Sequence, residues 1–195
     1  MQYDLNLYKY GVYPRNPSGL KGVLFSPFLH SGFEHLINNS IPILVLGTSL
    51  FYFYKDLAGK VIFWSWLMAG IWLWVSGREN FHIGASGIVY ALASFLFFSG
   101  LFRRQKQLIA ISLLVTFLYG SMVWGILPIE EGISFEGHLW GAVSGLVLAI
   151  YFKKQGPQRK KYDWELEDDD DDEVIFEEVV PNDHSDIKIN YHYKK

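Results

Sequence analysis

The sequence predicts an all-α polytopic membrane protein built as a bundle of helices. Half of its 195 residues are apolar, and 17% are aromatic. The apolar residues concentrate in residues 36–152, in stretches of roughly 16 to 20 with few charges, close to the ~20 that cross a hydrocarbon core about 30 Å thick. The absence of cysteine excludes disulfides and cysteine-based metal sites.

The apolar stretches predict five membrane-spanning helices. They cover about residues 36–54, 61–76, 83–102, 108–127 and 137–152. Several contain glycine, which membrane helices tolerate because no water competes for the backbone and small residues allow close contacts between helices. Gly141 and Gly145 form a GxxxG pattern that predicts close packing of the last helix.

The segment before the first helix has a different character. Residues 1–35 contain Pro14, Pro17 and Pro27 beside several glycines, a pattern typical of an extended and turn-rich chain. Because the segment also carries many aromatic and aliphatic residues, we expect it to form an outer loop that lies against the membrane interface.

The segment after the last helix is strongly charged. Residues 153–195 begin with lysines and then include five consecutive aspartates, Asp168 to Asp172. Such a block repels itself, so the pattern predicts a solvated and disordered tail. The predicted domain organisation is therefore a loop, a transmembrane domain over residues 36–152 and a tail.

The distribution of basic residues predicts the orientation in the membrane. Ten of them fall on the side of the tail: Lys55, Lys60, Arg103, Arg104, Lys106, Lys153, Lys154, Arg159, Lys160 and Lys161. Four fall on the other side: Lys9, Arg15, Lys21 and Arg78. The positive-inside bias then places the tail in the cytoplasm and the first residues of the chain outside.

Polar residues near the starts of three apolar runs indicate a site below the outer membrane surface. His35 and Asn39 lie in the first run, Ser86 in the third and His138 in the fifth. Polar residues are costly in a membrane interior, so they indicate a functional site. A serine and a histidine near the same end of separate helices suggest a nucleophile and its base.

The residues around Ser86 and His138 suit this chemistry. Gly84, Ser86 and Gly87 have the form GxSG, in which glycines leave the hydroxyl uncrowded and the backbone N–H groups free to face an oxyanion. His138 precedes Gly141 and Gly145 on one helix face, which would let the imidazole approach the hydroxyl. Each element alone is also consistent with simple helix packing.

His30, His35 and Asn39 form a third element with the spacing HxxxxHxxxN. His35 and Asn39 are four residues apart and share a helix face, and both can donate hydrogen bonds to a developing negative charge. The alternative interpretation is a polar cluster that ties the N-terminal segment to the first helix, which we prefer for His30.

Together these three elements resemble the rhomboid family of intramembrane serine proteases, over roughly residues 20–152. The resemblance implies a Ser86–His138 dyad without an acidic third member and an oxyanion site made by His35, Asn39 and backbone N–H groups around Ser86. It also implies that Tyr90 packs against the catalytic histidine. The remaining matches, His30, Gly84, Gly87, Gly141 and Gly145, would be supporting residues.

The resemblance also sets expectations for the number of helices and for the substrate. Minimal family members have six helices, so the first would be absent from the five predicted here. The implied reaction is acyl transfer on transmembrane segments of other proteins, which enter between the helices over residues 36–54 and 108–127. Because a helical peptide bond is shielded by its own hydrogen bonds, we expect glycine, proline or other helix-weakening residues near the cut.

Two other functions are consistent with the sequence. A rhomboid-like pseudoprotease would bind membrane clients without cleaving them. A metal site would use His30, His35, His82 and His138, although no acidic or cysteine ligand lies at matching depth. The predicted protease needs no cofactor and no nucleic-acid partner, and its surroundings are the lipid bilayer.

Overall fold

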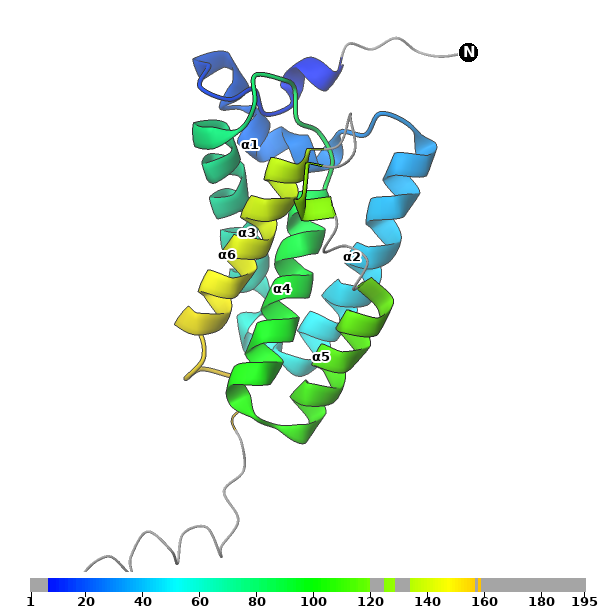
Figure 1. Ribbon diagram of the computed structural model, residues 1–195, viewed down its shortest axis with the longest axis vertical. Coiled ribbons are helices and arrows are strands. Elements are labelled where there is room, and N and C mark those ends of the chain that lie inside the picture. Colours follow the sequence, from blue (N-terminus) through cyan, green and yellow to red (C-terminus); the bar gives the residue numbers. More distant parts are fainter. Residues whose placement is uncertain (1–6, 120–124, 129–133, 157, 159–195) are drawn as a thin grey trace, which may run out of the picture. The chain divides into compact units, whose positions relative to one another are not determined.

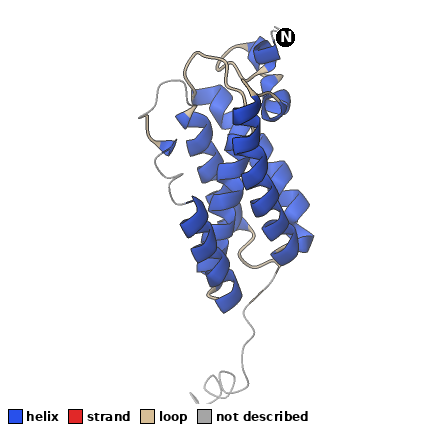
Figure 2. Cartoon of the chain, turned by 90° about the vertical axis from the view of Figure 1, so that its right-hand side faces the viewer, coloured by secondary structure: helices blue, strands red, loops and turns tan. Residues whose placement is uncertain are grey.

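The computed structural model describes residues 7–119, 125–128, 134–156 and 158. Six helices lie in this part of the chain: α1 (Gly22–Phe25), α2 (Phe33–Phe53), α3 (Lys55–Ser76), α4 (Ser86–Arg103), α5 (Lys106–Tyr119) and α6 (Phe135–Tyr151). The described residues include no strand, and the all-α prediction is confirmed (Figures 1 and 2).

Helix α4 forms the centre of the bundle. It packs against α2, α3, α5 and α6 (Figure 1). Half of its most apolar 18-residue segment is buried, against 17% in α2 and 28% in α3. A helix that is apolar on all sides is stable in this central place because protein surrounds it. The position of α4 thereby brings its first residue, Ser86, among several elements.

The outer helices carry their apolar side chains on the surface. Leu44 on α2 and Phe117 on α5 are 70% and 86% exposed. Helices α2, α3 and α4 are long and apolar enough to cross a membrane, and α5 is a shorter apolar helix. Exposed apolar surface of this extent is stable where lipid rather than water covers it.

Glycines set the close approach of α4 and α6. A Cβ atom at Gly141 would collide with the carbonyl oxygen of Gly87, and one at Gly145 would collide with that of Ala91. The Ser94 hydroxyl crosses the same contact and donates to the Ala142 carbonyl, with 2.7 Å between the two oxygens. Small residues therefore bring the helix that starts at Ser86 against the helix that carries His138.

The N-terminal segment is turn-rich in its described part, as predicted, but its turns are short and helical rather than extended. Turns of 3-10 helix at Leu7–Tyr10, Pro17–Gly19 and Ser26–Phe28 accompany α1. The segment is tied to α3, because Trp74 donates to the Asn16 carbonyl and Trp66 donates to the Val23 carbonyl, at 2.9 and 2.7 Å.

Several predicted helix ends also need correction. The second helix begins at Lys55 rather than at residue 61. Only Tyr54 separates it from α2. The third begins at Ser86 rather than 83, because Gly84 has a φ of 109° that breaks the helix. Residues 125 and 126 form a 3-10 turn, so the fourth helix does not run to 127. Residue 157 and residues 159–195 of the predicted tail lie outside the described residues.

Candidate active site

The polar residues singled out in the sequence line one cavity of about 610 Å³. His35 and Asn39 enter it from α2, Ser86 and Tyr90 from α4, and His138 from α6. The structure thus brings together side chains that are far apart in the chain, with His35 and His138 separated by 103 residues. His30 lies outside this cavity and lines a neighbouring apolar one.

Ser86 is the first residue of α4, directly after a sharp turn in the backbone. Gly84 makes this turn with its φ of 109°, in the left-handed region that favours glycine. A Cβ atom there would also come within 2.7 Å of the Nε2 atom of His35. Glycine at 84 therefore allows both the turn before Ser86 and the approach of the His35 ring to it.

The contacts of His138 determine which of its ring nitrogens carries the proton. Its Nδ1 atom lies 2.8 Å from the carbonyl oxygen of Gly125. A carbonyl oxygen only accepts, so Nδ1 donates and the lone pair of neutral imidazole is on Nε2. The ring also stacks on that of Tyr90, with centroids 4.2 Å apart and planes 11° apart. His138 is therefore held on two sides with an unprotonated nitrogen.

The dyad hydrogen bond is not formed in this structure: among the described residues, His138 bonds to Gly125 and not to Ser86. In enzymes without substrate such bonds are often long and tighten when the substrate binds. Ser86 and His138 both line the cavity of about 610 Å³.

His35 and Asn39 are arranged as hydrogen-bond donors at the cavity. The Ser31 backbone N–H donates to Nδ1 of His35 at 3.4 Å, so neutral His35 carries its proton on Nε2, the atom beside Gly84. The buried Asn39 amide donates to the His35 carbonyl at 2.9 Å, which uses one of its two N–H groups. Both residues therefore retain a donor at the cavity that contains Ser86.

His30 packs edge-on against His35, with ring centroids 5.0 Å apart. Burial lowers the pKa of His30, and the neighbouring His35 lowers it further. A neutral His30 can lie beside His35 without repulsion. This contact is consistent with the supporting role expected of His30.

Sequence analysis missed a second serine–histidine contact beside the cavity. His82 is only 5% exposed, and its Nδ1 lies 2.6 Å from the hydroxyl oxygen of Ser134. The sequence pattern indicates His82 only as a possible metal ligand. Ser134 carried a local signal, because serine before a helix that starts with Glu136 in its first turn is typical of an N-cap. The Ser134 hydroxyl indeed accepts from the Gly137 backbone N–H at 3.3 Å.

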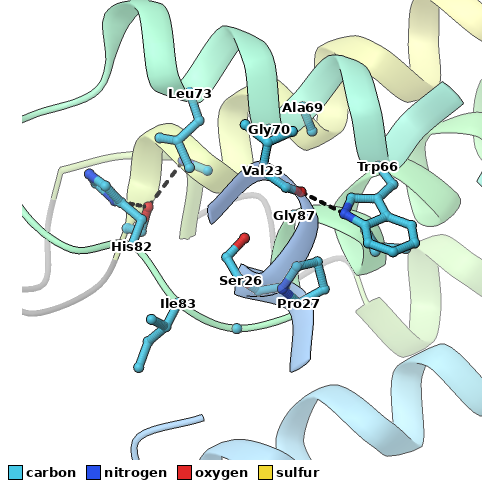
Figure 3. A pocket seen from close by; sticks show the side chains of 15 residues that line it. Val23, Ser26, Pro27, Trp66, Ala69, Gly70, Leu73, His82, Ile83 and Gly87 are labelled. Carbon is cyan, nitrogen blue, oxygen red and sulfur yellow. Dashed lines mark hydrogen bonds between the residues drawn. The ribbon is translucent and has the colours of Figure 1, made fainter. Parts of the chain in front are cut away.

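A smaller cavity of about 40 Å³ lies beside the loop before Ser86, and Ser86 itself is among its lining residues. Figure 3 shows residues that line this cavity, among them His82 and Ile83 of the loop and Val23 and Ser26 of the N-terminal segment. The cavity is bounded by Ala69 and other small or apolar residues of α3. His82 and Ser86 each line both cavities.

Comparison with known proteins identifies the family. The family model for the Rhomboid domain matches residues 17–155. The chain belongs to the rhomboid family. The match covers α1 to α6 and all of the candidate site residues, so the described bundle is a rhomboid domain in an integral membrane protein.

Three relatives illustrate the similarity to known proteins. An uncharacterized protein of Mycobacterium tuberculosis (strain ATCC 25618 / H37Rv) is 39% identical over 164 residues, which are 77% of this chain and 65% of that protein. An uncharacterized protein of Mycobacterium leprae (strain TN) is 38% identical over 72% of this chain and 59% of its own length. The protein named "Putative rhomboid protease YdcA" of Bacillus subtilis (strain 168) is 29% identical over 65% of each chain. The chain thus spans less than two thirds of the mycobacterial relatives.

Proposed function

We propose that this protein is an intramembrane serine endopeptidase that hydrolyses peptide bonds in transmembrane segments of other membrane proteins. The observation that carries the proposal is the hydrogen bond from His138 to the Gly125 carbonyl, which leaves the other imidazole nitrogen unprotonated at a cavity that also contains Ser86, His35 and Asn39. A base, a nucleophile and two donors at one cavity are the components that acyl transfer needs.

In the proposed first step, Nε2 of His138 takes the proton of the Ser86 hydroxyl while the serine oxygen attacks the scissile carbonyl carbon. The Gly125 carbonyl stabilises the imidazolium that forms, because it accepts from Nδ1 throughout. The imidazolium then donates its new proton to the leaving amine, and the carbon–nitrogen bond breaks. Water, activated by the same nitrogen, finally hydrolyses the acyl-enzyme ester.

The oxyanion of the tetrahedral intermediate would be stabilised by His35 and Asn39. The Nε2–H of His35 is next to the Gly84 turn, and one N–H of the Asn39 amide remains after its bond to the helix backbone. Donors already in place when charge develops contribute more than donors that must reorient, and loss of one such donor costs about 10²–10³ in rate.

The α2 wall of the cavity suits a substrate whose helix has unwound. Pro42 lies inside α2 and has no N–H, so it cannot donate to the Asn38 carbonyl one turn earlier. Both residues line the cavity. We expect substrates with glycine or proline near the cut, because the helix unwinds there, and the Asn38 carbonyl can accept from a backbone N–H of a neighbouring residue in the unwound segment. The proposed orientation has the cavity facing the outer side and the C-terminal tail in the cytoplasm, with entry between α2 and α5.

The proposal is tested with purified protein reconstituted in lipid vesicles together with a model transmembrane substrate and a fluorophosphonate serine probe. We expect the protein to react with the probe at Ser86 and to cleave a substrate containing glycine and proline. Both reactions should be lost in Ser86→Ala and in His138→Ala. Wild-type protein that neither reacts nor cleaves would overturn the proposal.

A second candidate function is client binding without cleavage, as in a pseudoprotease. It is favoured by one observation, the absence of a Ser86–His138 hydrogen bond among the described residues. The same experiment separates the two functions, because a pseudoprotease would retain the substrate in a pull-down from vesicles and would not react with the probe.

A further inference from the structure

His82 is fixed by contacts with three separate parts of the domain. It lies four residues before Ser86, in the loop between α3 and α4. Its backbone pairs in both directions with Val12, with N–O distances of 2.9 and 2.8 Å. Its side chain reaches the Arg78 carbonyl with Nε2 at 3.0 Å and the Ser134 hydroxyl with Nδ1 at 2.6 Å.

These contacts specify one tautomer of a neutral imidazole. The Arg78 carbonyl only accepts, so Nε2 of His82 carries the proton and Nδ1 accepts from the Ser134 hydroxyl. Burial lowers the pKa of His82, which is consistent with the neutral ring. The orientation of the Ser134 hydroxyl is therefore dictated by His82.

Ser134 connects His82 to the start of the helix that carries His138. With its proton directed to His82, the Ser134 oxygen accepts from the Gly137 N–H and caps α6. The Ser134 carbonyl accepts from the backbone N–H of His138 itself, at 3.2 Å. One residue thus joins the loop that leads to Ser86 and the backbone of His138.

An ion pair joins the same two elements a second time. The Arg78 Nε atom lies 2.6 Å from Oε1 of Glu136, and the Arg78 backbone N–H donates to the same oxygen at 3.3 Å. Glu136 is buried in the first turn of α6, where a negative charge is favourable. The loop before Ser86 and the first turn of α6 are therefore connected by a neutral link and by a charged link.

We propose that His82 is a positioning residue for the reaction: its hydrogen bond to Ser134 sets the place of the His138 ring relative to Ser86. His82 touches neither the substrate nor the reacting atoms in this role, and it acts through Ser134 and the first turn of α6. The inference rests on the proposed protease function. The inference adds to that function a link between His82 and Ser134, which depends on Nδ1 of His82 as the acceptor.

Two conservative substitutions separate the ring nitrogens. His82→Asn retains an oxygen near the place of Nδ1, where it can accept from Ser134, whereas His82→Gln retains a polar group near the place of Nε2. His82→Phe fills the same volume and retains neither. We expect the second-order rate of probe labelling at Ser86 to fall roughly tenfold in His82→Phe and His82→Gln, because small displacements of catalytic groups cost up to about 10²-fold. His82→Asn should recover most of the rate.

A double-mutant cycle assigns the effect to the link. Ser134→Ala should lower the labelling rate as His82→Phe does, and the two changes together should have no larger effect than either alone. Ser94→Ala is the matched control, because it removes one hydrogen bond between α4 and α6 away from the site. We expect the labelling rate of Ser94→Ala to remain within about twofold of the wild type, because this hydrogen bond lies away from the link between His82 and Ser134.

Hydrogen exchange of the α6 backbone provides a readout that does not require activity. The amides of Gly137 and His138 should exchange several-fold faster in His82→Phe and His82→Gln than in wild type or His82→Asn, because the Ser134 cap is weakened. Equal labelling in wild type, His82→Phe and His82→Gln would overturn the positioning role and leave the protease function intact. Absence of labelling in the wild type would instead overturn the protease function, and unchanged exchange would then overturn the link as well.

Discussion

The two ends of the α4–α6 pair both contain buried polar groups, but they differ in what those groups leave available. At the opposite end from Ser86, the buried Arg103 donates to the Ser99 hydroxyl and to the Phe152 carbonyl, at 2.9 and 2.7 Å, and its guanidinium lies 5.4 Å from the Tyr54 ring centroid. At the site end, His138 has an unprotonated nitrogen beside a cavity of about 610 Å³.

This difference separates polar groups that hold the bundle together from polar groups placed for chemistry. A buried polar group contributes to stability when its partners are present, as those of Arg103 are. A catalytic group must instead keep one atom for the substrate while its other atoms are held. Variants at the two ends should therefore affect different measurements.

The largest expected effect is at the site end. Ser86→Ala and His138→Ala should each lower cleavage by at least about a thousandfold, because either change removes a reacting group. Thermal unfolding should change little in Ser86→Ala, whereas His138→Ala also loses the stacking on Tyr90 and the bond to the Gly125 carbonyl, so its cleavage is compared per folded molecule. Ser40→Ala, which removes a serine hydroxyl that donates to the Leu36 carbonyl one turn earlier in α2, is the matched control and should retain full activity. Residual cleavage above one tenth in either site variant would contradict the assignment.

The next effect concerns the glycine contact that brings the two helices together. Gly141→Ala places a methyl group against the Gly87 carbonyl, so the helices must separate, at a cost of about 1–3 kcal/mol in the free energy of unfolding. Cleavage activity should also fall, because Ser86 and His138 lie on the two helices that separate. Gly47→Ala is the matched control, because a Cβ atom there meets nothing within 4 Å. Equal unfolding temperatures for the two variants would show that α4 and α6 do not pack as described.

At the opposite end, a change should affect stability and not chemistry. Arg103→Met retains much of the apolar stem but leaves the Phe152 carbonyl without this donor, at a cost of about 1–3 kcal/mol. The unfolding temperature should fall, while the labelling rate per folded molecule should stay within about twofold of the wild type. If the labelling rate of Arg103→Met falls as far as that of His138→Ala, the two ends of the α4–α6 pair are coupled, and Arg103 does not serve stability alone.

The smallest expected effect is a pH dependence at the site end. Because the pKa of His82 is lowered in the folded protein from its usual 6.5, the unfolded chain binds more protons as pH falls below 6.5, and stability decreases. Well above pH 6.5, His82 is neutral in both the folded and the unfolded state, so it causes no decrease in stability there. His82→Asn removes this titration, so its unfolding temperature should fall less between pH 7 and pH 5 than that of the wild type. Parallel decreases in the two proteins would contradict the buried, neutral state of His82.

The sequence predicted the parts of the site that local pattern encodes. Ser86, His138, His35 and Asn39 were recognisable because polar side chains stood in apolar runs, and all four line one cavity. The existence of the helices followed from hydropathy for the same reason. Helix ends were less well predicted: the start of α4 depends on the φ of Gly84, which hydropathy does not report.

The sequence by itself determined the all-α membrane bundle and its candidate nucleophile and base, because hydropathy and helix spacing are properties of neighbouring residues. Only the tertiary structure decided which nitrogen of His138 is unprotonated, since that depends on the Gly125 carbonyl 13 residues away. It also decided that His82 bonds to Ser134, 52 residues along the chain. A hydrogen bond forms only between atoms that the whole fold brings together, and no local pattern specifies which distant atoms those are.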